Sequence, residues 1–169
     1  MMELYTLTAL NRLKTNQLWI VQPKWYKFNY ELTDYVFVYA KIYTIGFWQT
    51  TTCFETSDEV LSIKSLWKGG LEIKTVDGSI VGTITRKALS RSVTFTLTTG
   101  HVYTYRAPSV WKSECIWTDE HNNELIRINF GSFSGKTSVS FDRRATEISN
   151  FAALVFLAFK INKDNAGHG

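Results

Sequence analysis

Hydrophobic and polar residues alternate with a period of two along most of the chain, which is typical of strands that bury one face. Residues 92–98 show the pattern clearly, because Val93, Phe95 and Leu97 are separated by threonines. Asp77 and Gly78 interrupt another such stretch, and an Asp-Gly pair favours a tight hairpin turn. We therefore predict a series of short strands joined by hairpin-length connections. The predicted strands are 4–10, 17–22, 24–32, 35–45, 47–55, 60–67, 71–76, 79–87, 92–98, 101–106, 111–118, 124–130 and 136–141.

The last part of the sequence has a different pattern. Residues 151–159 are apolar without interruption, and a helix that is apolar on every side must be buried on every side. The charge-free stretch 148–159 is too short for a membrane span, which needs about 20 residues. We therefore predict a core helix over about 146–161 and no transmembrane segment. Lys160 and Lys163 suit its carboxyl end, where cations meet exposed carbonyl groups.

The order of these elements predicts the fold class. About twelve antiparallel strands followed by one apolar helix indicate an all-β protein with one C-terminal helix. A barrel of this size has an interior too wide for strand side chains alone to fill. We therefore expect an antiparallel β-barrel around a buried apolar helix. The length of 169 residues fits one domain, which we place at 1–163, with 164–169 as a flexible tail.

Two segments resemble the tubby-like superfamily, in particular its LURP-one-related and scramblase-like branch. Residues 71–87, LEIKTVDGSIVGTITRK, look like the hairpin of that branch, with a strand, a glycine turn and a basic end. Residues 145–159, ATEISNFAALVFLAF, look like its buried helix. The resemblance is one of architecture. The sequence departs from the branch in its aromatic N-terminal half, and it shows neither the Pro-rich N-terminal region nor the membrane-length end of the scramblases. It implies a tubby-like barrel and a non-enzymatic module, in a superfamily that includes phosphoinositide-binding proteins.

The basic residues are unevenly distributed. Net charge is only +4, which is small for a dedicated nucleic-acid binder, and no RNP-type sequence occurs, so we expect no nucleic-acid partner. Between residues 79 and 113, however, there are five basic residues and no acidic one. These form the candidate anion- or lipid-binding set: Arg86, Lys87, Arg91, Arg106 and Lys112. Such residues donate charge-assisted hydrogen bonds to phosphate groups. The alternative is that they lie scattered on solvated strand faces.

Aromatic residues are concentrated between Trp19 and Trp48, which hold 11 of the 25 in the chain. In 35–45, strict alternation puts Phe37, Tyr39 and Tyr43 on the face opposite to Ala40 and Ile42. If the aliphatic face lines the barrel, the aromatic face is exposed. The candidate partner surface is then Trp25, Phe37, Tyr39 and Tyr43, which suits a protein partner or a second copy of the chain. The alternative is that both faces are buried.

Other segments of the sequence do not match known phosphate-binding, metal-binding or catalytic motifs. Residues 131–136, GSFSGK, have one residue too few between the glycines for a phosphate-binding loop, and a strand pattern follows them. His101, His121 and His168 lack metal-ligand spacing, and no nucleophile elbow occurs. We therefore predict no enzymatic activity, no metal and no cofactor. Gly46 and Trp48 match the Gly-x-Trp of lipocalins, so a lipocalin-like small-molecule carrier stays a second alternative, which would require an empty lumen.

The cysteines and the N-terminal residues bear on the cellular compartment of the protein. Cys53 and Cys115 lie far apart in apolar strand patterns, and we expect them to be buried free thiols. No signal peptide is visible at the N-terminus. We expect a cytoplasmic protein, with peripheral attachment to an anionic membrane surface if the lipid-binding hypothesis is correct. Binding of anionic phospholipid or phosphoinositide headgroups is the leading hypothesis, and a protein-interaction module is its main alternative.

Overall fold

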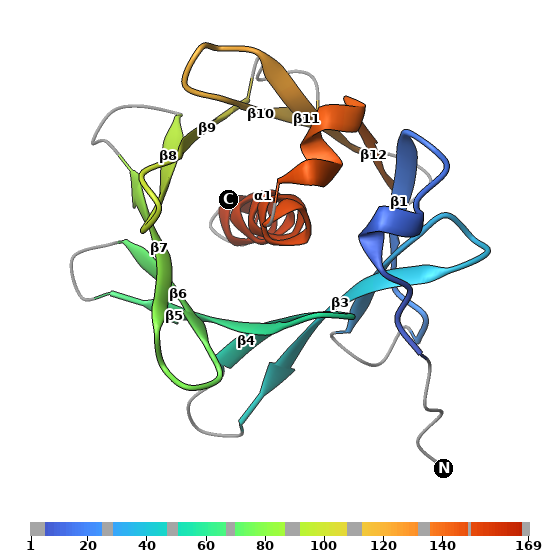
Figure 1. Cartoon of the computed structure of the whole chain (residues 1–169), viewed down its shortest axis with the longest axis horizontal. Coiled ribbons are helices and arrows are strands. Elements are labelled where there is room, and N and C mark those ends of the chain that lie inside the picture. Colours follow the sequence, from blue (N-terminus) through green and yellow to red (C-terminus); the bar gives the residue numbers. More distant parts are fainter. Residues whose placement is uncertain are drawn as a thin grey trace.

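A computed structural model shows a chain that is mostly β-strand, with one C-terminal helix (Figure 1). The structure describes residues 6–24, 29–46, 51–66, 70–86, 92–107, 113–131, 136–148 and 150–166. Its helical elements are the 3-10 helices η1 (Leu10–Arg12) and η2 (Arg143–Glu147) and the α-helix α1 (Phe151–Ala166).

Twelve strands form one closed antiparallel barrel. They are β1 (Gln17–Val21), β2 (Tyr30–Thr33), β3 (Val38–Ile45), β4 (Thr51–Thr56), β5 (Val60–Ser65), β6 (Leu71–Thr75), β7 (Ile80–Arg86), β8 (Val93–Leu97), β9 (Val102–Arg106), β10 (Glu114–Thr118), β11 (Glu124–Phe130) and β12 (Thr137–Phe141). Each strand pairs with its neighbours in sequence, and β1 pairs with β12 to close the ring. The prediction of an antiparallel barrel of about twelve strands is therefore confirmed.

The alternation predicted from the sequence determines which side chains are buried. In β8, Val93, Phe95 and Leu97 are at most 5% exposed, whereas Thr94 and Thr96 lie on the other face. Neighbouring strands approach closely at Gly82 in β7. A Cβ atom added there would lie 2.7 Å from the carbonyl oxygen of Thr96, so this position requires glycine.

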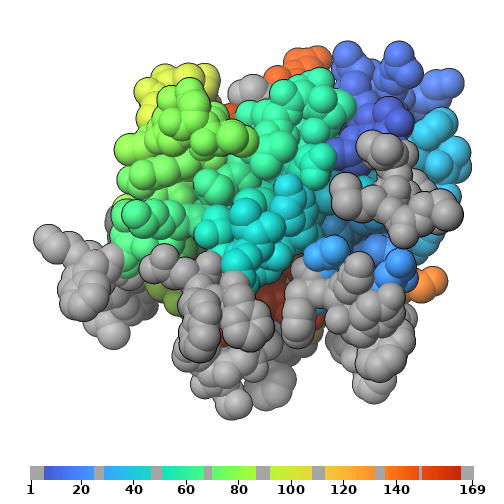
Figure 2. All heavy atoms as spheres, turned by 90° about the horizontal axis from the view of Figure 1, so that it is seen from below, coloured from blue at the N-terminus to red at the C-terminus, as the bar shows by residue number. Residues whose placement is uncertain are grey.

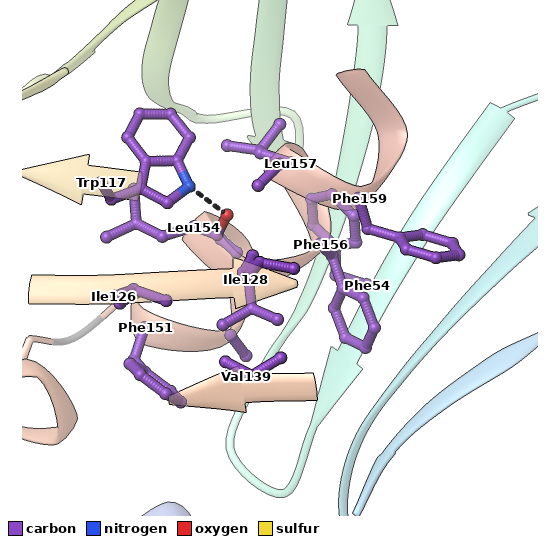
Figure 3. Close-up of a cluster of buried hydrophobic side chains, with 14 of the residues drawn as sticks. Phe54, Trp117, Ile126, Ile128, Val139, Phe151, Leu154, Phe156, Leu157 and Phe159 are labelled. Atoms are coloured by element: carbon purple, nitrogen blue, oxygen red, sulfur yellow. Dashed lines mark hydrogen bonds between the residues drawn. The ribbon is translucent and has the colours of Figure 1, made fainter. Parts of the chain in front are cut away.

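Helix α1 supplies the most deeply buried part of the core. Figure 1 draws α1 within the outline of the strand ring, and every side chain from Phe151 to Phe159 is at most 5% exposed. Three of its phenylalanines contact rings on three different strands. The ring centroid of Phe151 lies 5.0 Å from that of Phe141 in β12, and that of Phe159 lies 4.6 Å from that of Tyr30 in β2. The centroids of Phe156 and Phe54, in β4, are 5.7 Å apart (Figure 3). Contact with separate strands along its length fixes the position of the helix against the wall.

One hydrogen bond ties the helix to the wall. The indole N–H of Trp117, in β10, donates to the carbonyl oxygen of Leu154 at 2.7 Å (Figure 3). Both residues are completely buried, so the bond satisfies a polar atom that would otherwise lose its water at a cost of about 1–3 kcal/mol. It also fixes the rotation of α1 about its own axis, because only one carbonyl can meet this donor.

The structure corrects the predicted strand at 4–10 in its described part. Residues 6–9 form no strand, although the amide of Thr8 donates one hydrogen bond to the carbonyl oxygen of Val38 at 2.8 Å. The physical reason is closure of the barrel. Because β1 already pairs with both β2 and β12, the ring has no free edge to accept another strand.

The bounds of the last helix also differ from the prediction. Residues 143–147 form η2, capped by the Asp142 carboxylate, which accepts from the amide of Arg144 at 2.9 Å. Helix α1 begins only at Phe151 and continues to Ala166, so residues 164–166 are helical where we expected a flexible tail. None of the helices in the described residues is long and apolar enough to cross a membrane.

The prediction for the two cysteines is confirmed. Cys53 and Cys115 are free and buried. Burial raises the pKa of the Cys115 thiol to about 12 and also raises the pKa of Cys53. Neither sulfur is therefore a reactive thiolate at neutral pH.

Replacement of Leu154 by Asp is expected to unfold the protein. The new carboxylate would have no ionic partner at a completely buried position, which costs several kcal/mol, against a total stability of about 5–15 kcal/mol for a typical domain. The measurement is thermal unfolding followed by circular dichroism. Val76→Asp is the matched control, because Val76 is 82% exposed, and it should keep the wild-type midpoint. A wild-type midpoint for Leu154→Asp would contradict the burial of α1.

Candidate functional site

The antiparallel order gives the barrel two different ends. All odd-numbered strands finish at one end, which we call the basic end, after Val21, Ile45, Ser65, Arg86, Arg106 and Phe130. All even-numbered strands finish at the other, which we call the turn end. Helix α1 begins at the turn end and runs toward the basic end, because Phe151 contacts the end of β12 and Phe159 contacts the start of β2. Figure 2 shows the wall from the side, with η2 (orange) and the first described residues (blue) at the upper, turn end.

Acidic residues are concentrated in the connections at the turn end. The five hairpin turns there are 34–37, 57–59, 76–79, 98–101 and 119–123, all within the described residues. Together they contain six carboxylates and no lysine or arginine: Asp34, Asp58, Glu59, Asp77, Asp119 and Glu120. Several of these carboxylates accept hydrogen bonds from turn amides, as Asp119 does from His121 at 2.9 Å and Asn123 at 2.8 Å. The acidic residues thus stabilise the turns and give these five turns a net negative charge.

The sequences that join the strands at the basic end have the opposite charge. The segments 22–29, 46–50, 66–70, 87–92, 107–113 and 131–136 contain no Asp or Glu. They contain seven basic residues: Lys24, Lys27, Lys68, Lys87, Arg91, Lys112 and Lys136. They also contain four of the six tryptophans, Trp25, Trp48, Trp67 and Trp111. The structure describes only the flanks of these segments, so this contrast is one of sequence.

Two of the five predicted basic residues are described, and they lie on opposite faces of the wall. Arg86 lies on the same face of β7 as the buried Gly82 and Ile84. It pairs with Val93 of β8, which pairs in turn with Tyr105 of β9, and both of these residues are buried. Burial raises the pKa of Tyr105, and the positive charge of Arg86 partly opposes that rise. Arg86 therefore lies at the inner side of the barrel mouth, with its side chain exposed.

Arg106 belongs to the outer face. It follows the buried Tyr105 in β9, and its guanidinium donates to the side-chain oxygen of Asn122 at 2.9 Å. Lys87, Arg91 and Lys112 lie outside the described residues. The segments that contain them begin and end at the basic end, next to Arg86 and Arg106. The described residues therefore do not form one patch, because the Arg106 side chain reaches Asn122 in the turn 119–123, at the turn end.

Further cations at this end were not among the predicted anion-binding residues. Lys24 and Lys163 are exposed, and the ammonium of Lys163 lies 5.5 Å from the ring centroid of Tyr30. Lys136 is also exposed, and its ammonium lies 6.0 Å from the ring centroid of Tyr35. Lys160 pairs with Asp164 at 3.2 Å. The difference in charge between the two sets of connections could have been found from the sequence alone, by counting charges separately in alternate connections.

The expectation of a surface position for Tyr39 is wrong. Its side chain is only 1% exposed, because a register shift in the β2–β3 pair leaves Tyr39 without a partner between Val38 and Ala40. This irregularity breaks the alternation, and Tyr39 and Ala40 are both buried. The Tyr39 hydroxyl donates to Asp34 at 2.9 Å. Desolvation and the hydrogen bond to Asp34 raise the pKa of Tyr39 to about 12.

The rest of the predicted partner surface is divided. Phe37 is 51% exposed and follows Tyr35 and Val36, which are 57% and 75% exposed, in the turn between β2 and β3. Tyr43 is half-buried, and burial followed by the charge of Glu55 raises its pKa. Trp25 lies outside the described residues. The exposed apolar surface in this region is therefore the turn 35–37 rather than one face of β3.

Neither a metal centre nor a known relative assigns a function. Among the described residues, no group of three or more His, Cys, Asp or Glu side chains is placed to hold a metal ion. Comparisons with protein-family models, with curated proteins and with solved structures find no match. Functional inference therefore rests on the geometry and charge of the barrel itself.

Tyr39 leads to a prediction about alkaline pH. An unfolded tyrosine loses its proton near pH 10, whereas Tyr39 in the folded chain keeps it until about pH 12. Its contribution to stability is therefore complete below pH 10 and is lost as the pH rises through this window. Tyr39→Phe should have a lower free energy of unfolding than the wild type at neutral pH. Between pH 10 and 12, however, the free energy of unfolding of the variant should fall less steeply than that of the wild type, and the two slopes should differ by up to about 1.4 kcal/mol per pH unit. Urea unfolding across this range tests it, and equal slopes for both proteins would refute it.

Proposed function

We propose that this chain is a non-enzymatic, tubby-like module, in which α1 fills the barrel lumen and the basic end binds anionic phospholipid or phosphoinositide headgroups. The separation of charge between the two ends carries the proposal. Six connections on one end bring seven basic residues and no acidic one, while five turns on the other bring six acidic residues and no basic one. A molecule polarised in this way would approach an anionic surface with its basic end.

The other residues of the same segments support a membrane surface rather than free phosphate. Tryptophan is enriched where a protein meets the interface between lipid and water, because its ring is apolar and its N–H is polar. Four of the six tryptophans belong to these segments, and the described strand ends beside them include Ile45, 52% exposed, and Leu66, 38% exposed. Phosphate recognition alone would require cations but would not require apolar side chains beside them.

Attachment of this kind would be peripheral. Each lysine or arginine close to an anionic membrane contributes about 1 kcal/mol, and the attraction weakens as salt screens it. Arg86 and Lys163 would meet the headgroups from the barrel mouth, and Lys24 and Lys136 from its rim. The proposal also fits a cytoplasmic location, since anionic lipids are concentrated in the cytoplasmic leaflet.

The deciding experiment measures binding to liposomes of phosphatidylcholine, alone or with phosphatidylserine or a phosphoinositide at equal total charge, across a salt series. We expect binding to both anionic liposomes that weakens with salt. Equal binding would indicate recognition of charge, and preference for the phosphoinositide would indicate recognition of the headgroup. The triple variant Arg86→Ala/Lys87→Ala/Arg91→Ala should bind on the order of a hundredfold more weakly, from three charges at about 1 kcal/mol each.

The matched control removes three charges from the other end. Arg12, Arg143 and Arg144 are exposed and lie in or next to η1 and η2, which contact each other. The variant Arg12→Ala/Arg143→Ala/Arg144→Ala should bind liposomes within about threefold of the wild type, since its lost charges face away from the membrane. Equal weakening of both triple variants would show that only net charge matters. Absence of binding at low salt would refute the lipid-binding proposal.

A second candidate function is supported by the turn 35–37. Three consecutive apolar side chains are more than half exposed there, and exposed apolar patches often mark protein interfaces. The chain would then be an interaction module that uses the β2–β3 turn. Val36→Asp should abolish self-association or partner binding without changing the thermal midpoint. A concentration series by light scattering tests the homodimer, and an unchanged mass for wild type and variant at every concentration would exclude it.

A further inference from the structure

A cavity lies at the turn end, between the first turn of α1 and the β4–β5 hairpin. Its volume is about 490 Å³, within the range of about 300–1,000 Å³ that is usual for small-molecule sites. The apolar residues that line it are Leu10, Phe54, Leu61, Ala152 and Ala153. Phe54 is 1% exposed and stacks on Phe156 of α1 (Figure 3). The apolar wall of the cavity is therefore continuous with the packed core.

The polar groups that line the cavity differ in how many hydrogen bonds they already make within the protein. The Thr56 hydroxyl accepts from the amide of Glu59 at 3.2 Å and donates to the carbonyl oxygen of the same residue at 3.4 Å. The Asp58 carboxylate accepts from the hydroxyl of Ser57 at 3.0 Å. Within the described part of the chain, the carboxylate of Glu59 has neither a hydrogen bond nor an ion pair. Asn150 lines the cavity as well. Glu59 is thus a carboxylate that the fold leaves available beside the apolar wall.

The electrostatic surroundings of Glu59 favour a cation. Burial raises the pKa of Glu59, and the neighbouring charge of Asp58 adds to that rise, so an ammonium group there would offset both effects. The start of α1 contributes a weak positive potential, which two carboxylates outweigh. A carboxylate or phosphate ligand would instead meet two like charges.

We propose that this cavity binds a small amphiphile that has an apolar chain and a primary ammonium group, with the chain against Phe54 and Ala153 and the ammonium on Glu59. The site does not depend on the lipid-binding proposal, because it lies at the opposite end of the barrel. A pocket of this kind gives the chain a capacity for small molecules even though α1 occupies its core.

The test compares three probes that share one chain: octylamine, octanol and octanoate. Each is titrated at mildly alkaline pH into the full-length, isotope-labelled protein, and amide resonances are followed by NMR. We expect octylamine to shift the resonances of residues 56–61 and 152–153 and to bind more tightly than the other two. Glu59→Gln should weaken octylamine at least tenfold and change octanol less than twofold. Ala153→Leu should weaken all three, because its side chain would occupy the cavity.

Controls make each outcome decisive. Glu147→Gln removes one exposed carboxylate from the same end of the barrel without touching the cavity, and it should leave octylamine binding unchanged. Thermal midpoints establish that Ala153→Leu is folded, and Glu59→Gln tests the site independently if it is not. Octanoate binding as tightly as octylamine, an unchanged affinity in Glu59→Gln, or shifts confined to other residues would each overturn the proposal. The liposome assay has no bearing on these outcomes.

Discussion

The burial of α1 against the barrel wall is the interaction on which the rest of the structure depends. A ring of twelve strands encloses more space than inward side chains alone can fill, and each strand of this chain has one apolar face that must be kept from water. The uninterrupted apolar run of the helix belongs to the same buried core as these faces. Its phenylalanines pack on rings of β2, β4 and β12, and Trp117 satisfies the carbonyl oxygen of Leu154. These contacts extend from Phe151, beside the end of β12, to Phe159, beside the start of β2.

This arrangement leaves the two ends free to differ. Side chains in the wall are constrained by packing and alternation, whereas the connections are constrained only by their own turn geometry. At the turn end, carboxylates accept hydrogen bonds from turn amides, as Asp34 does from the amides of Val36 and Phe37 at 2.9 and 2.7 Å. At the basic end, the connecting sequences contain lysine, arginine and tryptophan instead. A charge difference between ends therefore arises without any cost to the core.

Much of the fold could be predicted from sequence because alternation and apolar periodicity reflect burial directly. The segment 92–98 and the run 151–159 illustrate this, since both are buried in the predicted manner. Alternation failed where the backbone departs from a regular ladder, as at Tyr39, because nothing in the local pattern marks an unpaired residue. The predicted helix start near residue 146 is wrong because residues 143–147 form the separate 3-10 helix η2, and α1 begins only at Phe151.

The candidate site was harder to predict than the fold. Five basic residues in one stretch of sequence suggested one patch, yet Arg86 and Arg106 lie on opposite faces of the wall because their strand positions have opposite parity. Both strands finish at the basic end, yet the Arg106 side chain extends back to Asn122 in the turn 119–123. The cavity beside Glu59 could not be predicted at all, since Leu10, Phe54 and Ala153 come from three distant segments.

The pairing of β1 with β12 has a consequence for how the protein is made. Residues 17–21 must wait for residues 137–141 before the ring can close, and α1 is synthesised later still. While the chain is being synthesised, the sheet therefore has two unpaired edges and an uncovered apolar face, both of which invite association with other chains. Contacts between segments so distant in sequence also make folding slow. The unfinished sheet is therefore open to aggregation until α1 has been synthesised.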